Sequence, residues 1–345
     1  MPMASAGAPA QTAPEPVCRH RVARRIAWWH WASLLLGVIA AAAVFHGAVP
    51  RWLVQHNERS ERTAAGLVLR RVQVDDHSIA YLEGGAGETV VLLHGFGADK
   101  DNWTRCARDL TPAFHVVAPD LPGFGESSFV DGASYRMEEQ VRRLERLAQV
   151  LGLTRFHLAG NSMGGQIAGH YAVAHPERVR SLALVDCTGV RSPVLSDMEE
   201  GIRSGERPPL VVRTLGDFDR RMDFLVVQVP EIPGFVKRVL VDRARMMADN
   251  HDVILSQITP EMEALEPALS RIAVPTLVLW GDRDRMRDLS SVIVLERGLP
   301  QSESVILRDC GHVPMSERPQ EFAEHYRRFL DPAFSATGGQ NRPGK

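Results

Sequence analysis

This chain has few cysteines and few aromatic residues, and neither sign of charge is in clear excess. The 345 residues include four cysteines, and no pair of them forms a Cys-x-x-Cys motif or another metal-ligand cluster. This argues against a zinc site and against a disulfide-rich scaffold. Aromatic residues make up 6% of the chain, and the formal net charge is -2. Without an excess of basic residues there is no electrostatic case for nucleic acid as a partner.

The rest of the composition is that of an ordinary globular protein. Hydrophobic residues make up 44% of the chain and charged residues 24%, and no internal repeat is found. The length allows one large α/β domain with a small insertion. One disulfide among Cys106, Cys187 and Cys310 stays open at this stage, because it depends on an oxidising compartment.

The most informative segment, Gly160 to Gly164, reads Gly-Asn-Ser-Met-Gly and centres on Ser162. A short apolar strand at 156–159 precedes it, and a start of small residues typical of a helix follows at 165–172. A serine on a sharp strand-to-helix turn exposes its hydroxyl beside a backbone N–H, which suits a nucleophile next to an oxyanion. The pattern therefore predicts that Ser162 is a catalytic nucleophile.

Two partners follow Ser162 in the order that this chemistry uses, first an acid and then a histidine. The strand at 275–280 ends in a turn rich in carboxylates, and the strand at 304–307 leads to His312. We predict His312 as the base that takes the serine proton and Asp284 as the acid that orients the imidazole. Asp282 and Asp288 are close competitors for that acid. Asp186, at the end of the strand 181–185, is a weaker one.

A glycine-rich loop completes the expected site. The apolar strand 89–93 opens into His94-Gly-Phe-Gly97. We expect the backbone N–H groups of Phe96 and Met163 to form the oxyanion hole. His94 itself is interpreted as structural, with its ring bonded to nearby backbone. Cys310 has no pattern of a nucleophile, and we interpret it as a small buried residue.

These motifs resemble those of α/β-hydrolases, in particular the membrane-anchored monoacylglycerol lipases and the related bacterial lipases and esterases. The matching segments are 91–103, 118–127, 160–165, 280–284, 310–312 and 317–319. The resemblance covers roughly 68–330, and it implies the catalytic roles given above for Ser162, Asp284, His312, Phe96 and Met163. Carbon–carbon bond hydrolases share the Gly-Asn-Ser-Met-Gly-Gly turn, so the substrate is less well specified than the fold.

The sequence predicts an α/β fold, with a mostly parallel sheet covered by helices on both faces. Eight strand candidates alternate with helices, and the more polar first two suit an antiparallel edge hairpin. The core is expected at 67–190 and 272–331. The long stretch 191–271 is predicted to be a helical cap or lid over the site. The segment 332–345 is expected to be a disordered tail.

The N-terminal region is expected to be a separate unit. Residues 1–25 look like a disordered basic leader, and the uncharged apolar stretch at 26–49 is long enough for one transmembrane anchor. Residues 50–66 would form a stalk. A cleaved signal peptide is the alternative. The arginine balance favours an N-terminus inside and a catalytic domain on the far side of the membrane.

The function expected from these features is hydrolysis of a carboxylic ester, acylglycerol or another lipid-like ester, through an acyl-enzyme. No metal or organic cofactor is needed. Two alternatives stay open: a carbon–carbon bond hydrolase acting on a diketone, and a non-enzymatic binding protein tethered to a membrane.

Overall fold

A computed structural model describes residues 28–38, 47–262 and 264–331 of the chain. By its contacts the chain divides into two compact units, Met1–Trp52 and Leu53–Lys345. In the first unit, residues 28–38 are helical. Among the described residues no helix is both long and apolar enough to cross a membrane. Residues 26–27 and 39–46 of the predicted anchor lie outside these residues, as do the predicted leader 1–25 and tail 332–345.

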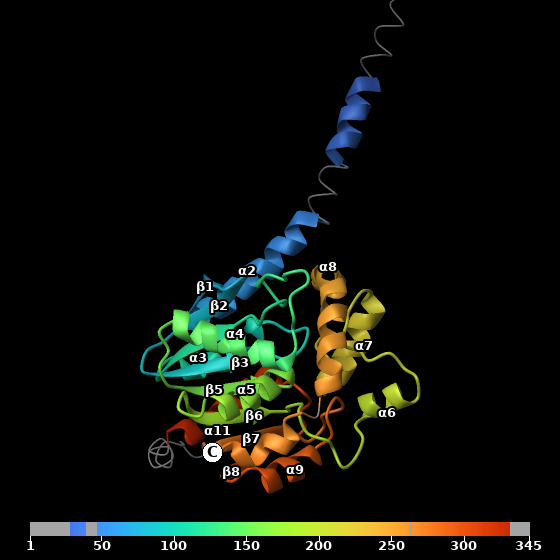
Figure 1. Ribbon diagram of the computed structural model, residues 1–345. Coiled ribbons are helices and arrows are strands. Elements are labelled where there is room, and N and C mark those ends of the chain that lie inside the picture. The colour runs from blue at the N-terminus through green and yellow to red at the C-terminus, as the bar shows by residue number, and fades with distance from the viewer. Residues whose placement is uncertain (1–27, 39–46, 263, 332–345) are drawn as a thin grey trace, which may run out of the picture. The chain divides into compact units, whose positions relative to one another are not determined.

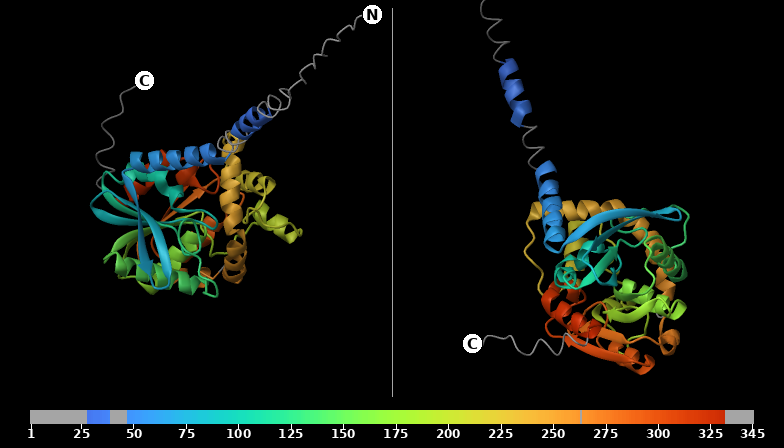
Figure 2. Two further views of the ribbon diagram at one scale, coloured as in Figure 1. Left: turned by 90° about the horizontal axis from the view of Figure 1, so that it is seen from above. Right: turned by 90° about the vertical axis from the view of Figure 1, so that its left-hand side faces the viewer.

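The second unit is built on one eight-stranded sheet with the order β1-β2-β4-β3-β5-β6-β7-β8. Its strands are β1 Leu67–Val74, β2 His77–Gly84, β3 Glu88–Leu93, β4 Phe114–Pro119, β5 Phe156–Asn161, β6 Val179–Val185, β7 Thr276–Gly281 and β8 Ser302–Leu307. β1 and β2 pair antiparallel, β2 pairs antiparallel with β4, and the remaining pairs are parallel. β1 and β8 lie at opposite ends of the twisted sheet (Figures 1 and 2). The predicted edge hairpin and mostly parallel sheet are confirmed.

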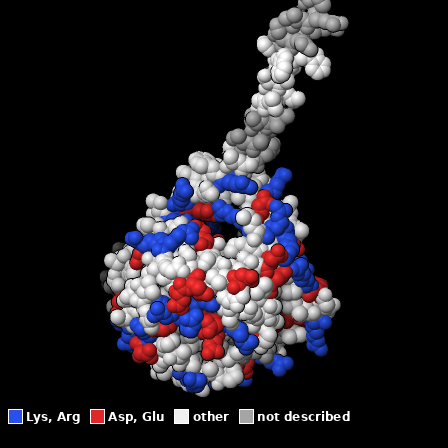
Figure 3. Space-filling model, turned by 45° about the horizontal axis from the view of Figure 1, so that its top comes forward, with Lys and Arg blue, Asp and Glu red and all other residues white. Residues whose placement is uncertain are grey.

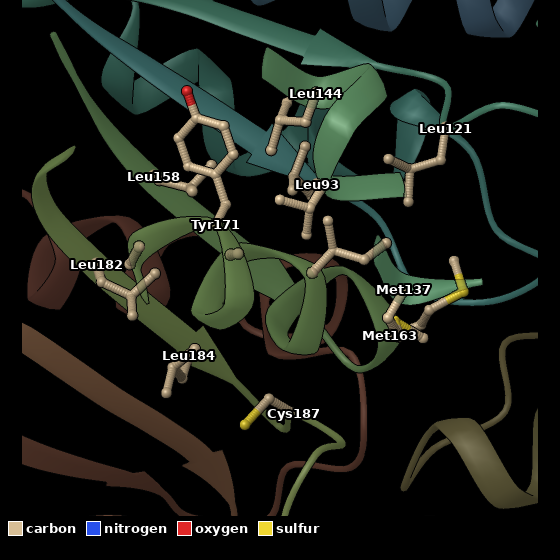
Figure 4. Packing of buried hydrophobic residues seen from close by; sticks show 14 of the residues in the cluster. Leu93, Leu121, Met137, Leu144, Leu158, Met163, Tyr171, Leu182, Leu184 and Cys187 are labelled. Atoms are coloured by element: carbon tan, nitrogen blue, oxygen red, sulfur yellow. The ribbon is translucent and has the colours of Figure 1, made fainter. Parts of the chain in front are cut away.

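Helices cover both faces of the sheet because the strand residues alternate between two apolar clusters. Val91 and Leu93 join the cluster under α4, α5 and α9, whereas Val90 and Leu92 join the one under α3 and α11. Figure 4 shows part of the first cluster. The helices are α2 Val49–Ala64, α3 Thr104–Leu110, α4 Met137–Val150, α5 Met163–Ala174, α6 Asp197–Arg203, α7 Leu215–Leu225, α8 Gly234–Ile258, α9 Ser291–Gly298, α10 Pro314–Glu317 and α11 Pro319–Leu330.

The stretch between β6 and β7, predicted as a cap, is helical. It contains α6, α7 and α8, followed by the 3-10 turns η3 Thr259–Glu261 and η4 Glu266–Arg271. Elsewhere in the chain, the 3-10 turn η2 Lys100–Trp103 follows β3. α7 and α8 lie beyond the ends of the central strands (Figure 1). Helices α6 and α7 both begin with a capping box, at Ser196 and Thr214, which satisfies their first N–H groups.

The segment predicted as a stalk is also a helix, α2. From Leu53 onward it belongs to the second unit. Val54 is buried there, and the Arg62 guanidinium donates to both carboxylate oxygens of Asp101, each at 2.6 Å. The C-terminal part of α2 is thus docked on the core rather than free.

Candidate active site

Ser162 occupies the turn between β5 and α5. Its backbone lies in the left-handed region, with φ 55° and ψ -121°. This conformation is strained for a residue with a side chain, and such strain concentrates at functional sites. Ser162 N–H donates to Val185 O at 2.9 Å, and its own carbonyl accepts from Gly165 and Thr188. The turn is therefore held by β6 on one side and by α5 on the other.

Two glycines make this turn possible by allowing close backbone approach. A side chain at Gly160 would lie 2.1 Å from Gly164 O, and one at Gly164 would lie 2.5 Å from Leu93 O. Any Cβ atom at either position would collide with backbone, which cannot move aside cheaply. The glycines of the motif are thus explained by packing of strand against helix.

His312 lies in the loop between β8 and α10, and its ring faces Asp284. Its Nδ1–H donates to Asp284 Oδ2 at 2.8 Å, and the Asp284 side chain is fully buried. The other carboxylate oxygen accepts from the backbone N–H groups of Met286 at 2.7 Å and Arg287 at 3.1 Å. These bonds fix the carboxylate, and the carboxylate fixes the ring tautomer, which leaves Nε2 of His312 free of a proton.

The other candidate acids have different partners. Asp288 accepts from Ser290 N–H at 2.8 Å, as a turn former does. Asp282 accepts from Cys310 N–H at 3.4 Å and lies 3.8 Å from Arg308. Asp186 accepts from Gly281 N–H at 2.9 Å and lies near both Asp284 and His312. Oxygens of these two carboxylates and a nitrogen of His312 all lie within 4.8 Å of one another. Such a group could hold a cation, but the hydrogen bond between Asp284 and His312 already uses two of its atoms.

The expected oxyanion loop follows β3. Phe96 and Met163 are both buried, and both line the cavity that Ser162 and His312 also line. Met163 is the first residue of α5, and the first N–H groups of a helix have no partner within it. Its N–H is thus available at the positive end of the helix dipole. Figure 4 shows Met163 next to Met137 at one end of the apolar cluster.

His94 supports this loop from within. Its Nδ1–H donates to Gly95 O at 2.7 Å, and its Nε2 accepts from Leu121 N–H at 2.9 Å. Burial lowers the pKa of His94 to about 4, so the ring is neutral and both bonds keep these directions at neutral pH. The hydrogen bonds agree with the structural interpretation of His94.

Three residues that the sequence did not single out connect the loops of the site. Arg221 of α7 donates to Phe96 O at 2.9 Å, and Asn161 donates to the carbonyl of His312 at 2.9 Å. Glu317 accepts from Gly311 N–H and from Val227 N–H, each at 2.8 Å. Burial raises the pKa of Glu317. The signal for Glu317 and Asn161 was their place inside the matching motifs, but Arg221 had no such signal.

The site opens into two connected spaces. A narrow cavity of about 40 Å³ holds Ser162 and His312, and its wall is mainly apolar. The apolar lining residues are Phe96, Met137, Met163, Met198, Leu210, Leu255, Ile258, Met262 and Met286. A larger groove of about 1250 Å³ shares Ser162, His312 and Phe96 and continues past α7 and α8 to α2. Figure 3 shows a hollow on one face of the molecule with charges of both signs around it.

The three described cysteines are free and buried. No disulfide therefore joins Cys106, Cys187 or Cys310 in this structure. Burial raises the pKa of each thiol above its usual value, to about 12 for Cys187. A buried thiol with a raised pKa is unreactive, which agrees with the interpretation of Cys310 as a small buried residue.

The comparison with known families decides what this chain is. The alpha/beta hydrolase fold family matches residues 88–319. The chain belongs to the α/β-hydrolase family. Lipase 1 of Psychrobacter immobilis is 38% identical over 274 residues, which cover 78% of this chain and 86% of that protein. Monoacylglycerol lipase ABHD6 of Homo sapiens is 29% identical over 283 residues, which cover 78% and 84%.

A solved structure extends this similarity to three dimensions. The crystal structure of a membrane phospholipase A, described as a bacterial virulence factor, aligns with a TM-score of 0.82 and 48% identity. The alignment covers 88% of this α/β-hydrolase and 98% of that chain. The predicted family is confirmed, and so is the prediction that the chain is a carboxylic ester hydrolase.

Proposed function

We propose that Ser162, His312 and Asp284 form a catalytic triad that hydrolyses esters of lipids through an acyl-enzyme. The observation that carries this proposal is the bond of 2.8 Å between His312 Nδ1 and Asp284 Oδ2, at the wall of the cavity where Ser162 also lies. The left-handed backbone of Ser162 supports the same assignment. Ester hydrolysis through an acyl-enzyme uses such a nucleophile, with a base beside it and a fixed acid behind the base.

The reaction would proceed in two halves. His312 Nε2 takes the proton of the Ser162 hydroxyl while its oxygen attacks the ester carbonyl carbon. The N–H groups of Phe96 and Met163 stabilise the negative oxygen that forms. The bond to the alcohol then breaks, and the alcohol leaves with the proton from His312. Water enters, gives a proton to His312 and attacks the carbonyl carbon of the acyl group. The bond between that carbon and the Ser162 oxygen then breaks, the carboxylic acid leaves, and Ser162 recovers the proton from His312.

The walls of the site favour a lipid ester as the substrate. The narrow cavity beside Ser162 is lined by methionine and aliphatic side chains, which suit an acyl chain. The wide groove has basic and acidic residues, among them Arg59, Glu58 and Arg243, which suit a polar head group. The relatives reported above, a phospholipase and two lipases, are named for action on lipids, which supports an acyl chain in the narrow cavity and a polar head group in the wide groove.

A fluorophosphonate probe tests the nucleophile directly. Wild type should be labelled and Ser162→Ala should not, whereas Ser302→Ala, on an exposed position of β8, should be labelled like wild type. p-Nitrophenyl esters of increasing chain length and a vinylogous diketone should then be assayed together. Turnover of the esters that is lost in Ser162→Ala supports the proposal. Full ester turnover by Ser162→Ala, or turnover of the diketone alone, would overturn it.

We also propose that residues 26–49 hold this enzyme at a membrane, with the catalytic domain on the side away from the cytoplasm. The basis is the long uncharged stretch with tryptophans near its ends. Extraction of membranes with alkaline carbonate should leave the full-length chain in the pellet, and protease added to intact cells or spheroplasts should reach the domain. Release of a shortened chain into the medium would instead indicate a cleaved signal peptide.

A further inference from the structure

Asp186 is a buried carboxyl group for which the triad chemistry has no role. It follows β6 directly, and its backbone has a positive φ of 43°. β6 and β7 pair in parallel, with Val185 opposite Leu279. Asp186 therefore reaches the end of β7, close to the loop that carries Asp284. Its exposed fraction is 0%, so water does not solvate this carboxyl group.

The hydrogen bonds of Asp186 are incomplete if it is ionised. Its Oδ1 accepts from Gly281 N–H at 2.9 Å. Its Oδ2 is buried and has no donor among the described residues. A buried carboxylate oxygen without a donor is costly and calls for an explanation. The nearby carboxylate of Asp284 offers one, because oxygens of both groups and a nitrogen of His312 lie within 4.8 Å of one another.

Two adjacent carboxylates in a dry site do not both ionise, so one of them retains a proton. Asp284 accepts three N–H bonds, from Met286, Arg287 and His312, which stabilise its negative charge. Asp186 accepts one. The difference in donors places the proton on Asp186. A protonated Oδ2 is a hydrogen-bond donor, so it can donate to the nearby carboxylate of Asp284 and no longer lacks a partner.

We propose that Asp186 is a positioning residue, which as a neutral acid donates its O–H to Asp284 and holds that carboxylate in line with His312. This inference rests on the proposed triad. The pair of carboxyl groups next to His312 then has one negative charge, on Asp284, while Asp186 is neutral. Burial, and then the charge of Asp284, raise the pKa of Asp186 well above its usual value, in agreement with this state.

The groups around Asp186 favour the neutral form as well. Asp284 from the loop after β7 and Glu317 from α10 both act on it with negative charge. Two thiols also lie near Asp186: Cys187 is its neighbour in the chain, and Cys310 lies in the loop after β8. Burial raises the pKa of both thiols and keeps them protonated. His312 completes the set through its bond to Asp284.

Asparagine mimics a neutral aspartic acid, and this gives the test. In Asp186→Asn the amide N–H₂ can donate to Asp284 while the amide oxygen accepts from Gly281. We expect its kcat within about threefold of wild type and an unchanged pH profile of kcat/KM, because the charge is unchanged. Asp186→Ala removes the donor, and we expect a kcat about tenfold lower with KM within about twofold.

Two outcomes would overturn the inference. If Asp186 is ionised in wild type, Asp186→Asn removes a negative charge and shifts the acidic limb of the profile by more than about half a pH unit to lower pH. If Asp186 has no positioning role, a folded Asp186→Ala keeps the wild-type kcat. Circular dichroism checks folding. Where the alanine variant does not fold, the infrared difference spectrum between wild type and Asp186→Asn decides. A protonated carboxyl band that is present in wild type and lost in Asp186→Asn supports the inference, and the absence of this band from wild type would overturn it.

Failure of this inference and failure of the triad are separate results. Full activity in Ser162→Ala would remove the triad itself, whatever the Asp186 variants do. An inactive Ser162→Ala combined with a shifted profile in Asp186→Asn would leave the triad in place and remove only the neutral acid.

Discussion

The strand ends of the core and the helices between β6 and β7 contribute to the site in different ways. All six positions of β5 are buried, whereas no residue of α7 is, and six of the 25 residues of α8 are. The core positions the residues of the proposed triad through backbone geometry. The helices reach the site through a few bonds, such as Arg221 to Phe96 O at 2.9 Å and His312 N–H to Leu225 O at 2.8 Å. The core therefore carries the proposed triad, and α7 bonds to two of the loops around it.

The largest effect is expected in the core, at Asp284. Asp284→Asn keeps the shape but removes the charge that fixes the His312 tautomer and stabilises the imidazolium. We expect kcat to fall by roughly 10³- to 10⁴-fold, by analogy with the same change in serine proteases. Steady-state kinetics on a p-nitrophenyl ester measure it.

Asp288→Asn is the matched control for that substitution, because Asp288 lies four residues away and its side chain accepts from Ser290 N–H as a turn former does. It should stay within about threefold of wild type, as expected for a turn residue outside the reacting groups. Equal losses in the two variants would mean that the acid is wrongly assigned.

An intermediate effect is expected where α7 meets the core. Arg221 donates to Phe96 O at 2.9 Å and to Leu210 O at 3.1 Å. Arg221→Met removes both bonds and loosens the loop whose N–H is proposed to stabilise the oxyanion. Complete loss of one oxyanion donor costs about 10²- to 10³-fold, so a displaced donor should cost about tenfold in kcat with little change in KM.

Arg220 is the neighbouring control, since it forms an exposed ion pair with Glu206 rather than a bond to the core. Arg220→Met should leave kcat unchanged. A boronic acid that mimics the tetrahedral state sharpens the comparison: its affinity should fall in Arg221→Met and hold in Arg220→Met. If both variants bind it as wild type does, α7 has no part in the oxyanion hole.

Most of the core could be predicted from the sequence because its signals are local. The apolar run before Ser162 predicted β5, and the flanking glycines predicted the turn. The end of β7 predicted the neighbourhood of the acid. The sequence favoured Asp284 as the acid but left Asp186 open, since parallel strands bring both residues to the same edge of the sheet. In the structure Asp284 has the 2.8 Å bond to His312 and two further bonds from backbone N–H groups.

The contacts of α7 were beyond sequence reasoning for a different reason. Arg221 and Phe96 are 125 positions apart, and nothing in the local pattern of α7 marks one of its arginines as special. Arg220 and Arg221 are identical in type and adjacent in the chain. Arg220 pairs with Glu206, whereas Arg221 bonds to the core, and the docking of the helix on the core determines this difference.

The smallest effect is expected in stability, where α8 contacts the loop proposed to form the oxyanion hole. The His251 ring lies 5.5 Å from the Phe96 ring and 5.0 Å from the Phe124 ring between centroids, and its Nε2 is buried without a partner among the described residues. Burial, and then the charge of Arg221, lower the pKa of His251 to about 4. His251→Phe keeps the ring contacts and removes an unpaired polar atom, which should raise stability at pH 7.5 by about 1 kcal/mol.

The pH dependence of this variant gives the sign of the effect. Below about pH 6.5 an unfolded histidine binds a proton that the buried ring of His251 does not, so the folded state loses stability as pH falls toward about 4. His251→Phe removes this contribution, which is on the order of 3 kcal/mol at most. Urea unfolding at pH 7.5 and pH 5 should therefore show a smaller acid loss in the variant, with the share due to His94 still present. Parallel losses in the two proteins would mean that the ring is protonated in the folded state, and that α8 rests on the core more loosely than its ring contacts indicate.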